Sequence, residues 1–293
     1  MKNIIVPLIF RFLAHLPLNA ARTMGTILGY GIWLIRGRSY RITLRNVRKC
    51  FPELSELQAQ CFVRESLIET TKTMLEAGAI WHNSSEWLHS KIITVEGEAI
   101  LRSELAKGKG LLVLAPHIGN WEVVGPYIAK IAPLTVMYQP LLLPALNDLI
   151  FGGRSKLNIS LAPTNRKGVC MLLKALQQGT TIGILPDQVP DKGAGAEPVN
   201  FFGHPAMTMS LVHALIERTD CRAISVFAKR VEGGFNIIIQ PAAAEIYSEN
   251  MRESLIGLNL SVEACVRLAP TQYQWEYSRF RSLPLHLRDP ENA

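Results

Sequence analysis

Short apolar runs that alternate with helical patterns constrain the fold of this chain more than any other feature. The run Gly110–Ala115 (GLLVLA) contains no polar side chain, as expected of a strand buried on both faces of a sheet. Helical patterns such as Lys167–Gln178 lie between the runs. Further strand patterns occur at Lys91–Val95, Leu134–Tyr138, Thr181–Leu185, Ala223–Ala228 and Phe235–Gln240. This alternation predicts an α/β fold over about residues 90–270, with a mainly parallel central sheet flanked by helices.

Positive charge is concentrated at the N-terminus. Residues 1–50 contain nine of the 31 Lys and Arg residues and none of the 24 Asp and Glu residues, so the rest of the chain is nearly neutral. Apolar runs at Ile4–Phe10 and Met24–Ile35 precede a cluster of cations, which are Arg36, Arg38, Arg41, Arg45, Arg48 and Lys49. Apolar segments beside such a cluster suit an anionic membrane surface. A nucleic-acid partner is not expected, because no nucleic-acid-binding motif follows.

Neither apolar run reaches the roughly 20 residues that a membrane-spanning helix needs. We therefore expect residues 1–35 to form an interfacial or re-entrant anchor, with one tilted span as the second possibility. Amphipathic helices that only cover the core are a third interpretation. The predicted division is a membrane-anchoring arm at residues 1–50 and a main domain at residues 51–293. In the main domain, Ser55 and Gln58 form a capping-box pattern that predicts a helix to about Trp81.

The five cysteines are scattered and contain no C-x-x-C pair. This argues against a disulfide framework and against a structural zinc site. Their spacing is typical of a protein in a reducing compartment.

The stretch APHIGNWE carries the clearest candidate for chemistry. His117 follows the predicted strand 110–115, at the end where open α/β sheets bind ligands. Gly119 permits a tight turn, and Asn120 is a good N-cap for a helix that begins at Trp121. We expect the Glu122 carboxylate to reach back to the imidazole, keep one ring nitrogen protonated and leave the other free as a base.

The strand before His117 separates this motif from a chance match. His286 precedes Glu291 by the same spacing, but in a polar tail with no strand before it. The chain has no G-x-S-x-G motif and no cysteine at a strand end near a histidine, so the base would act directly on an acceptor hydroxyl. A histidine that only packs or caps in the core remains the alternative.

Six stretches in the correct order resemble signatures of a known family. The sequence is similar to the lipid A biosynthesis late acyltransferases (lauroyl/myristoyl transferases) of the bacterial lysophospholipid acyltransferase superfamily. The stretches are Arg45–Val47 with Cys50–Ser55, Gly108–Glu122, Tyr138–Pro140, Leu185–Gln188, Phe201–Gly203 with Pro205–Thr208, and Gln272–Tyr277 with Arg279–Phe280. The resemblance implies a glycerolipid-acyltransferase-like fold.

The resemblance also implies roles for individual residues. His117 would deprotonate the acceptor hydroxyl and Glu122 would orient His117. Arg154, after two glycines, best matches a family arginine in catalysis or phosphate binding, with a solvated surface arginine as the alternative. Arg166 is a weaker candidate that otherwise simply begins a helix. Asp187 matches a family aspartate, for which capping of the following loop is the alternative to catalysis.

Asn120 and Gln188 are predicted to contact the substrate together with Arg166. The chain departs from the family at Val189, where many members have a second acid. The F-P-E-G-x-R block typical of glycerolipid enzymes is absent, which makes a simple glycerol-phosphate acceptor less expected. The family also acylates amino-acid lipids and glycolipids.

The resemblance implies an acyl thioester donor on acyl carrier protein, and a lipid A precursor as acceptor. Such a donor is already activated, so no cofactor or metal is expected. The oxyanion would be stabilised by backbone N–H groups near Asn120 or by Arg154. The basic stretch 36–49 would serve the acidic carrier, the membrane or both, on the cytoplasmic face of the bacterial inner membrane. A lipid-ester hydrolase and a non-catalytic membrane-binding protein are the competing interpretations.

Overall fold

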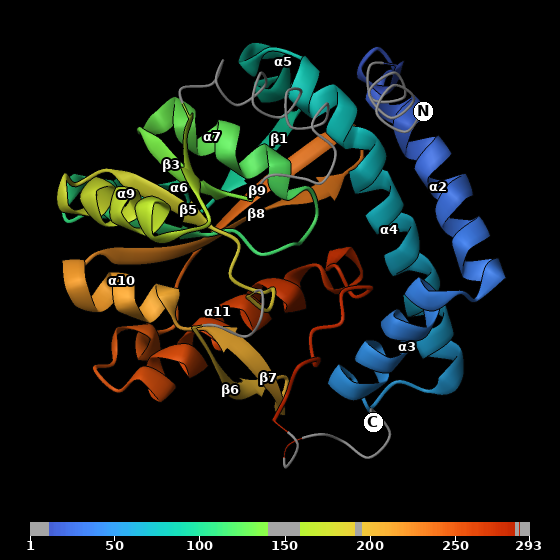
Figure 1. Ribbon diagram of the computed structural model, residues 1–293. Coiled ribbons are helices and arrows are strands. Elements are labelled where there is room, and N and C mark those ends of the chain that lie inside the picture. The colour runs from blue at the N-terminus through green and yellow to red at the C-terminus, as the bar shows by residue number, and fades with distance from the viewer. Residues whose placement is uncertain (1–11, 140–158, 191–194, 285–286, 288–293) are drawn as a thin grey trace.

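The computed structural model describes residues 12–139, 159–190, 195–284 and 287. They form a central sheet of seven strands with the order β1-β9-β8-β2-β5-β3-β4 (Figure 1). In chain order the strands are β1 (Ile92–Glu96), β2 (Leu111–Leu114), β3 (Leu134–Tyr138), β4 (Ile159–Pro163), β5 (Thr181–Ile184), β8 (Arg222–Val231) and β9 (Gly234–Pro241). Only the β8–β9 pair is antiparallel. The predicted α/β fold with a mainly parallel sheet is confirmed.

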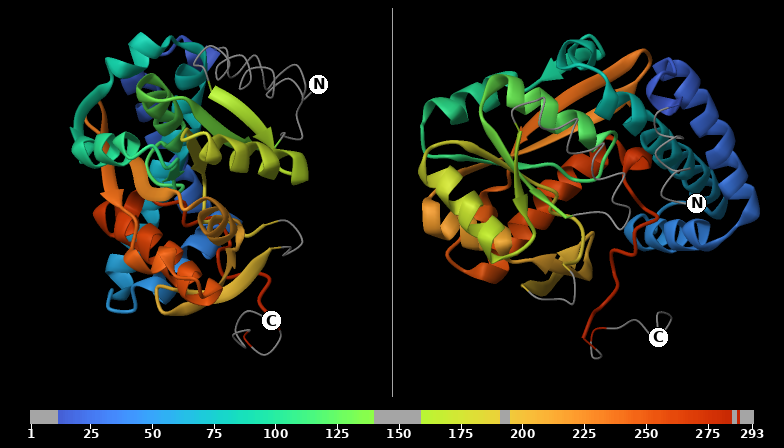
Figure 2. Two further views of the ribbon diagram at one scale, coloured as in Figure 1. Left: turned by 90° about the vertical axis from the view of Figure 1, so that its left-hand side faces the viewer. Right: turned by 45° about the horizontal axis from the view of Figure 1, so that its top comes forward.

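Helices cover both faces of this sheet (Figures 1 and 2). Helices α6 (Glu98–Ala106) and α7 (Val124–Ile131) pack on one face, in a core that also holds alternate residues of β2 and β9. On the other face lie α9 (Arg166–Gln177), α10 (Leu211–Thr219) and α11 (Met251–Leu268). Because helices lie on both sides, β2 and β5 are buried along their whole length, as the sequence predicts for 110–115.

The remaining elements surround this three-layer core. Four helices precede β1 in the chain, which are α2 (Leu18–Ile35), α3 (Arg38–Cys50), α4 (Glu56–His82) and α5 (Ser85–His89). The capping box at Ser55 and Gln58 is present at the start of α4, as predicted. A separate hairpin of β6 (Ala196–Phe201) and β7 (His204–Met209) packs beside α11. Three short 3-10 helices span Trp121–Val123, Ala244–Tyr247 and Pro270–Gln272.

Helix α2 lies along α4 at the edge of the molecule (Figure 2). Two glycines of α2 permit the close approach, because a Cβ on Gly25 would lie 2.8 Å from the Lys72 Cα and one on Gly29 would lie 2.5 Å from the Ile68 Cα. The hydroxyl of Thr71 donates a hydrogen bond to the Gly25 carbonyl oxygen at 2.7 Å. The first part of the predicted anchor lies outside the described residues. Within them, no helix has the length and apolarity to cross a membrane.

The close contact of Gly29 with α4 should contribute to the stability of the protein. Gly29→Ala should lower the free energy of unfolding by about 1–3 kcal/mol, because the added methyl overlaps the backbone of α4. Gly31→Ala, in the same helix with no atom within 4 Å of its Cβ position, should raise it by up to about 1 kcal/mol. Urea unfolding followed by circular dichroism measures both values. Equal effects of the two substitutions would show that α2 does not pack on α4 in this way.

Candidate active site

His117 and Asp187 meet because they follow neighbouring parallel strands at the same level. Leu114 at the end of β2 pairs with Ile184 at the end of β5, and each functional residue comes three positions later. The carboxyl ends of parallel strands share one edge of the sheet, where open α/β folds place their ligands. The structure therefore brings together two of the residues that the sequence singles out.

Asp187 holds His117 through both of its carboxylate oxygens. Its Oδ1 lies 2.8 Å from the ring Nδ1, and its Oδ2 accepts the His117 backbone N–H at 3.0 Å. Asp187 is only 3% exposed. Burial alone would raise the pKa of Asp187, but the charge of His117 and these hydrogen bonds outweigh burial, so its pKa lies below its usual value. Asp187 is therefore an ionised acceptor that keeps a proton on Nδ1.

The other ring nitrogen faces an amide donor. The Gln188 Nε2 lies 3.2 Å from the His117 Nε2 and donates a second hydrogen bond to the Gln274 Oε1 at 3.0 Å. An amide N–H requires an acceptor, so the His117 Nε2 presents its lone pair. The ring also packs against Trp121, with centroids 4.9 Å apart. In the tautomer that this arrangement favours, Nε2 is the basic nitrogen of the imidazole.

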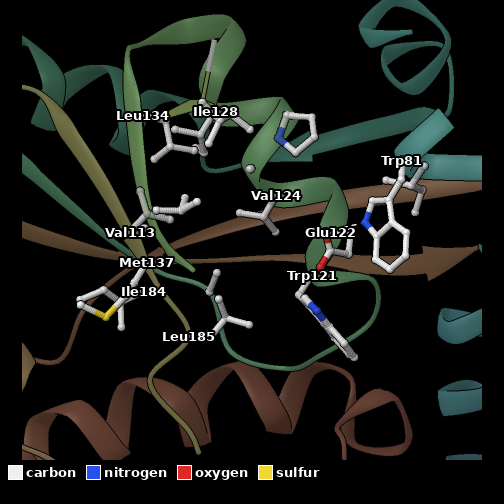
Figure 3. A pocket seen from close by; sticks show the side chains of 17 residues that line it. Trp81, Val113, Trp121, Glu122, Val124, Ile128, Leu134, Met137, Ile184 and Leu185 are labelled. Atoms are coloured by element: carbon white, nitrogen blue, oxygen red, sulfur yellow. Dashed lines mark hydrogen bonds between the residues drawn. The ribbon is translucent and has the colours of Figure 1, made fainter. Parts of the chain in front are cut away.

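Glu122 does not have the place that we expected for it. Asp187 takes the position beside Nδ1, while the Glu122 Oε2 accepts the indole N–H of Trp81 at 2.9 Å (Figure 3). The turn at Gly119 explains the difference, because the 3-10 helix after it sets Trp121 against the ring and directs Glu122 towards α4 and a neighbouring pocket. A catalytic role for Glu122 remains a prediction from its family motif.

Asn120 is the helix cap that the sequence predicts. Its Oδ1 accepts the Glu122 backbone N–H at 3.3 Å, and its Nδ2 donates to the Glu76 Oε2 at 2.8 Å. The side chain is fully buried, which favours capping over substrate contact. Its backbone N–H donates to the Ala228 carbonyl, and that of Gly119 donates to the Gln272 carbonyl. These two N–H groups are thus occupied and do not serve the expected oxyanion site.

Of the two predicted arginines, Arg166 lies in the described part of the chain and Arg154 does not. Arg166 is the exposed first residue of α9, and the preceding Asn165 caps this helix by accepting the Gly168 N–H at 3.2 Å. This placement fits the simpler interpretation that Arg166 begins a helix. Arg154 lies outside the described residues, so its role stays a prediction.

A buried group of charges supports the turn from behind. Glu76 of α4 is fully buried and accepts hydrogen bonds from Arg22 of α2, from Arg230 of β8 and from Asn120. Burial would raise the pKa of Glu76, but the two guanidinium groups and the Asn120 amide lower it overall. The Thr73 hydroxyl donates to the Gly119 carbonyl oxygen at 2.8 Å. The histidine turn is thereby bonded to α2, α4 and β8, a function that the sequence pattern of Arg22 and Glu76 does not reveal.

The C-terminal segment also contacts the turn. The Gln274 backbone N–H donates to the His117 carbonyl oxygen at 3.0 Å, and Tyr273 forms a β-bridge with Ile118. The amide of Asn46 in α3 donates at 2.8 Å to the carbonyl oxygens of both Trp275 and Tyr277. Four of the six signature stretches thus meet at the turn and its support, since Leu185–Gln188 supplies Asp187, although the sequence alone suggests no role for Asn46 or Gln274.

Gly119 is required by the geometry of this turn. Its φ angle is +59°, in the left-handed region that favours glycine. A Cβ there would lie 2.0 Å from the Ala228 carbonyl oxygen, so the turn cannot approach β8 with any side chain at this position. The sequence prediction of a tight turn at Gly119 is confirmed.

An apolar pocket opens beside the histidine turn (Figure 3). Its cavity volume is about 100 Å³, and the pocket is partly open to solvent. One wall is the sheet, with side chains of β2, β5, β3 and the start of β4, and the other is α7. Trp81, Trp121 and Glu122 lie at the end near His117. The apolar lining suits a hydrocarbon chain, and Trp121 connects the pocket to the imidazole. No group of three or more metal-ligating side chains occurs in the described part of the chain.

Comparison with known proteins identifies the family. The family model for bacterial lipid A biosynthesis acyltransferases matches residues 3–282. The chain is 25% identical over 275 residues to the lipid A biosynthesis lauroyltransferase of Escherichia coli (strain K12), covering 92% of this chain and 88% of that protein. It is 22% identical over 276 residues, with the same coverage, to the lipid A biosynthesis palmitoleoyltransferase of that organism.

A third relative comes from another organism. The chain is 26% identical over 289 residues to a lipid A biosynthesis acyltransferase of Haemophilus influenzae, covering 94% of this chain and 89% of that protein. The match of the family model over nearly the whole chain confirms the resemblance carried by the six stretches: the chain belongs to the bacterial lipid A biosynthesis acyltransferase family.

Proposed function

We propose that this chain transfers a fatty acyl group from an acyl thioester to a hydroxyl of a lipid A precursor, with His117 as general base. The observation that carries the proposal is the His117–Asp187 pair, whose imidazole packs against Trp121 in the lining of an apolar pocket, in a chain of this family. The relatives' names support acyl transfer in lipid A synthesis. Acyl carrier protein as the donor is our proposal from the family resemblance.

The reaction follows from the tautomer of the ring. The acceptor hydroxyl takes the place of the Gln188 amide at Nε2 and donates its proton there while its oxygen attacks the thioester carbonyl. Asp187 stabilises the resulting imidazolium. When the tetrahedral intermediate collapses, the C–S bond breaks and the leaving thiolate takes the proton from Nε2. Before this collapse, the displaced Gln188 amide is our proposed hydrogen-bond donor to the oxyanion.

A hydrolase would use the same pair to activate water. The pocket does not distinguish the two reactions, because both need the acyl chain beside the imidazole. The distinction is chemical: a transferase gives an acylated acceptor, whereas a hydrolase gives a free fatty acid. Mass spectrometry of the lipid products decides between them and also reports whether an amino-acid lipid or another glycolipid is the acceptor.

The surface of the N-terminal helices supports membrane attachment. The outer face of α2 exposes a continuous apolar stripe, formed by Met24, Ile27, Leu28, Leu34 and Ile35. The next helix, α3, exposes four arginines at helical spacing, which are Arg38, Arg41, Arg45 and Arg48. We propose that the apolar stripe enters the cytoplasmic leaflet of the bacterial inner membrane while the arginines bind anionic headgroups.

His117 and Asp187 should act as one unit in catalysis. His117→Ala and Asp187→Asn should each lower kcat/KM for acyl transfer by about 10²–10⁴-fold, and the double variant should be little worse than either single one. Asp220→Asn is the control, because Asp220 is an exposed aspartate paired with Lys109. Circular dichroism checks that each variant is folded. A folded Asp187→Asn enzyme with normal turnover would exclude Asp187 from the catalytic unit.

The membrane contact should have an apolar part and an electrostatic part. Ile27→Glu with Ile35→Glu should weaken co-sedimentation with both neutral and anionic vesicles, since both side chains are exposed on the α2 stripe. Arg41→Gln with Arg45→Gln should weaken binding to anionic vesicles only, by about 1 kcal/mol for each cation, and only at low salt.

Leu260→Glu is the control for these variants, because Leu260 is an exposed leucine on α11. Its binding should equal that of the unaltered protein. If the α2 variant also binds vesicles normally, this face of the molecule does not contact the membrane.

A further inference from the structure

Two glycines face each other across the apolar pocket. Gly183 lies in the middle of β5, where it pairs with Val113 of β2 on one side and with Val136 of β3 on the other. The three residues share one face of the sheet, so the missing side chain leaves a depression between two valines. Gly125 lies opposite, in α7. Both glycines line the pocket.

The pocket crosses the sheet from the histidine turn to β4. Its lining passes from Val113 of β2 over Gly183 of β5 and Leu134 of β3 to Ile159 of β4. Three strand spacings separate β2 from β4, which corresponds to about 14 Å. Figure 3 shows Leu134 at the opposite end of the pocket from Trp121 and Glu122. An acyl chain with its carbonyl near His117 would thus run beneath α7 and end near Leu134 and Ile159.

Packing and backbone geometry do not explain the glycine at position 125. Its φ angle is not in the left-handed region, and an added Cβ would lie 3.6 Å from the Ile159 Cδ1 and 4.0 Å from the Leu134 Cδ2, which are ordinary contact distances. Glycine is also among the least favourable residues in a helix. An alanine would therefore fit and would favour the helix, but its methyl would occupy the far end of the pocket.

A side chain at position 183, on the opposite wall, would also take up space in the pocket. A Cβ there would lie 3.1 Å from the Val136 Cγ1 and 3.7 Å from the Leu134 Cδ1, so it would narrow the pocket at the same leucine. Glycine inside a strand costs stability and often marks a place that a ligand approaches closely. A methyl group at either glycine would therefore contact the same residue, Leu134.

We propose that Gly125 and Gly183 set the longest acyl chain that this enzyme accepts, by leaving the far end of the pocket open around Leu134. This inference rests on the proposed acyl transfer. A methyl group at position 125 occupies space that the last carbons of the chain would fill. Shorter chains end before this point and bind as before.

The test compares acyl thioesters of increasing length, namely decanoyl, lauroyl, myristoyl and palmitoyl, with a lipid A precursor as acceptor. In Gly125→Ala, kcat/KM for the longest chain that the unaltered enzyme accepts should fall about 10-fold relative to the next shorter chain. Gly183→Ala should shift the preference in the same direction with some loss of thermal stability, because its Cβ contact is tight. Gly31→Ala, a glycine-to-alanine change in α2 with open space around it, should leave the preference unchanged.

The outcomes separate this inference from the proposed function. If the unaltered enzyme transfers no acyl chain to the precursor, the proposed function itself fails. If it does transfer a chain, and folded Gly125→Ala and Gly183→Ala keep the original length preference, only the inference on the glycines is overturned. Thermal unfolding provides a readout besides activity: Gly125→Ala should be at least as stable as the unaltered enzyme.

Discussion

The hydrogen bonds between Asp187 and His117 are the constraint on which the proposed chemistry depends. One carboxylate accepts both the ring N–H and the backbone N–H of the histidine, so it fixes the orientation of the imidazole and the position of the main chain together. This requires β2 and β5 to be adjacent, parallel and in register, with Leu114 opposite Ile184. A shift by one residue would turn one of the side chains away. The apolar packing of the sheet therefore also aligns His117 with Asp187, the pair that we propose as catalytic.

The turn that carries His117 is held by buried polar groups as well as by apolar packing. Glu76 and Arg230 are almost completely buried, and removing one partner of such a pair typically costs about 3–5 kcal/mol. Asn120 and Thr73 connect this pair to the backbone of the turn. The hydrogen bonds of this ion pair have fixed directions, so they orient the turn in a way that apolar side chains do not. The same carboxylate of Glu76 also binds Arg22 of α2, so the proposed membrane-facing helix and the catalytic turn share one buried anchor.

Much of the fold can be predicted from the sequence, because the period of apolar residues and the length of an apolar run are local properties. The apolar runs at 110–115 and 181–185 locate β2 and β5, and the capping box locates α4. Strand β4 and the β6–β7 hairpin are not predicted, since Ile159–Pro163 contains a serine and ends in a proline, and Ala196–Phe201 contains a proline and a glutamate. Partners across the sheet depend on strand order, which one sequence does not contain. That is why the spacing in the motif suggests Glu122 beside the ring where the structure has Asp187.

The proposed mechanism requires the His117 Nε2 to be the basic nitrogen, because Asp187 holds the proton on Nδ1. Nitrogen NMR of the folded enzyme with labelled histidine measures this directly at a pH where the ring is neutral. We expect a protonated Nδ1 and an unprotonated Nε2 for His117, and a loss of this preference in Asp187→Asn. A ring protonated at Nε2 in the unaltered enzyme would rule out this mechanism, because that nitrogen would have no lone pair with which to accept the proton of the acceptor hydroxyl.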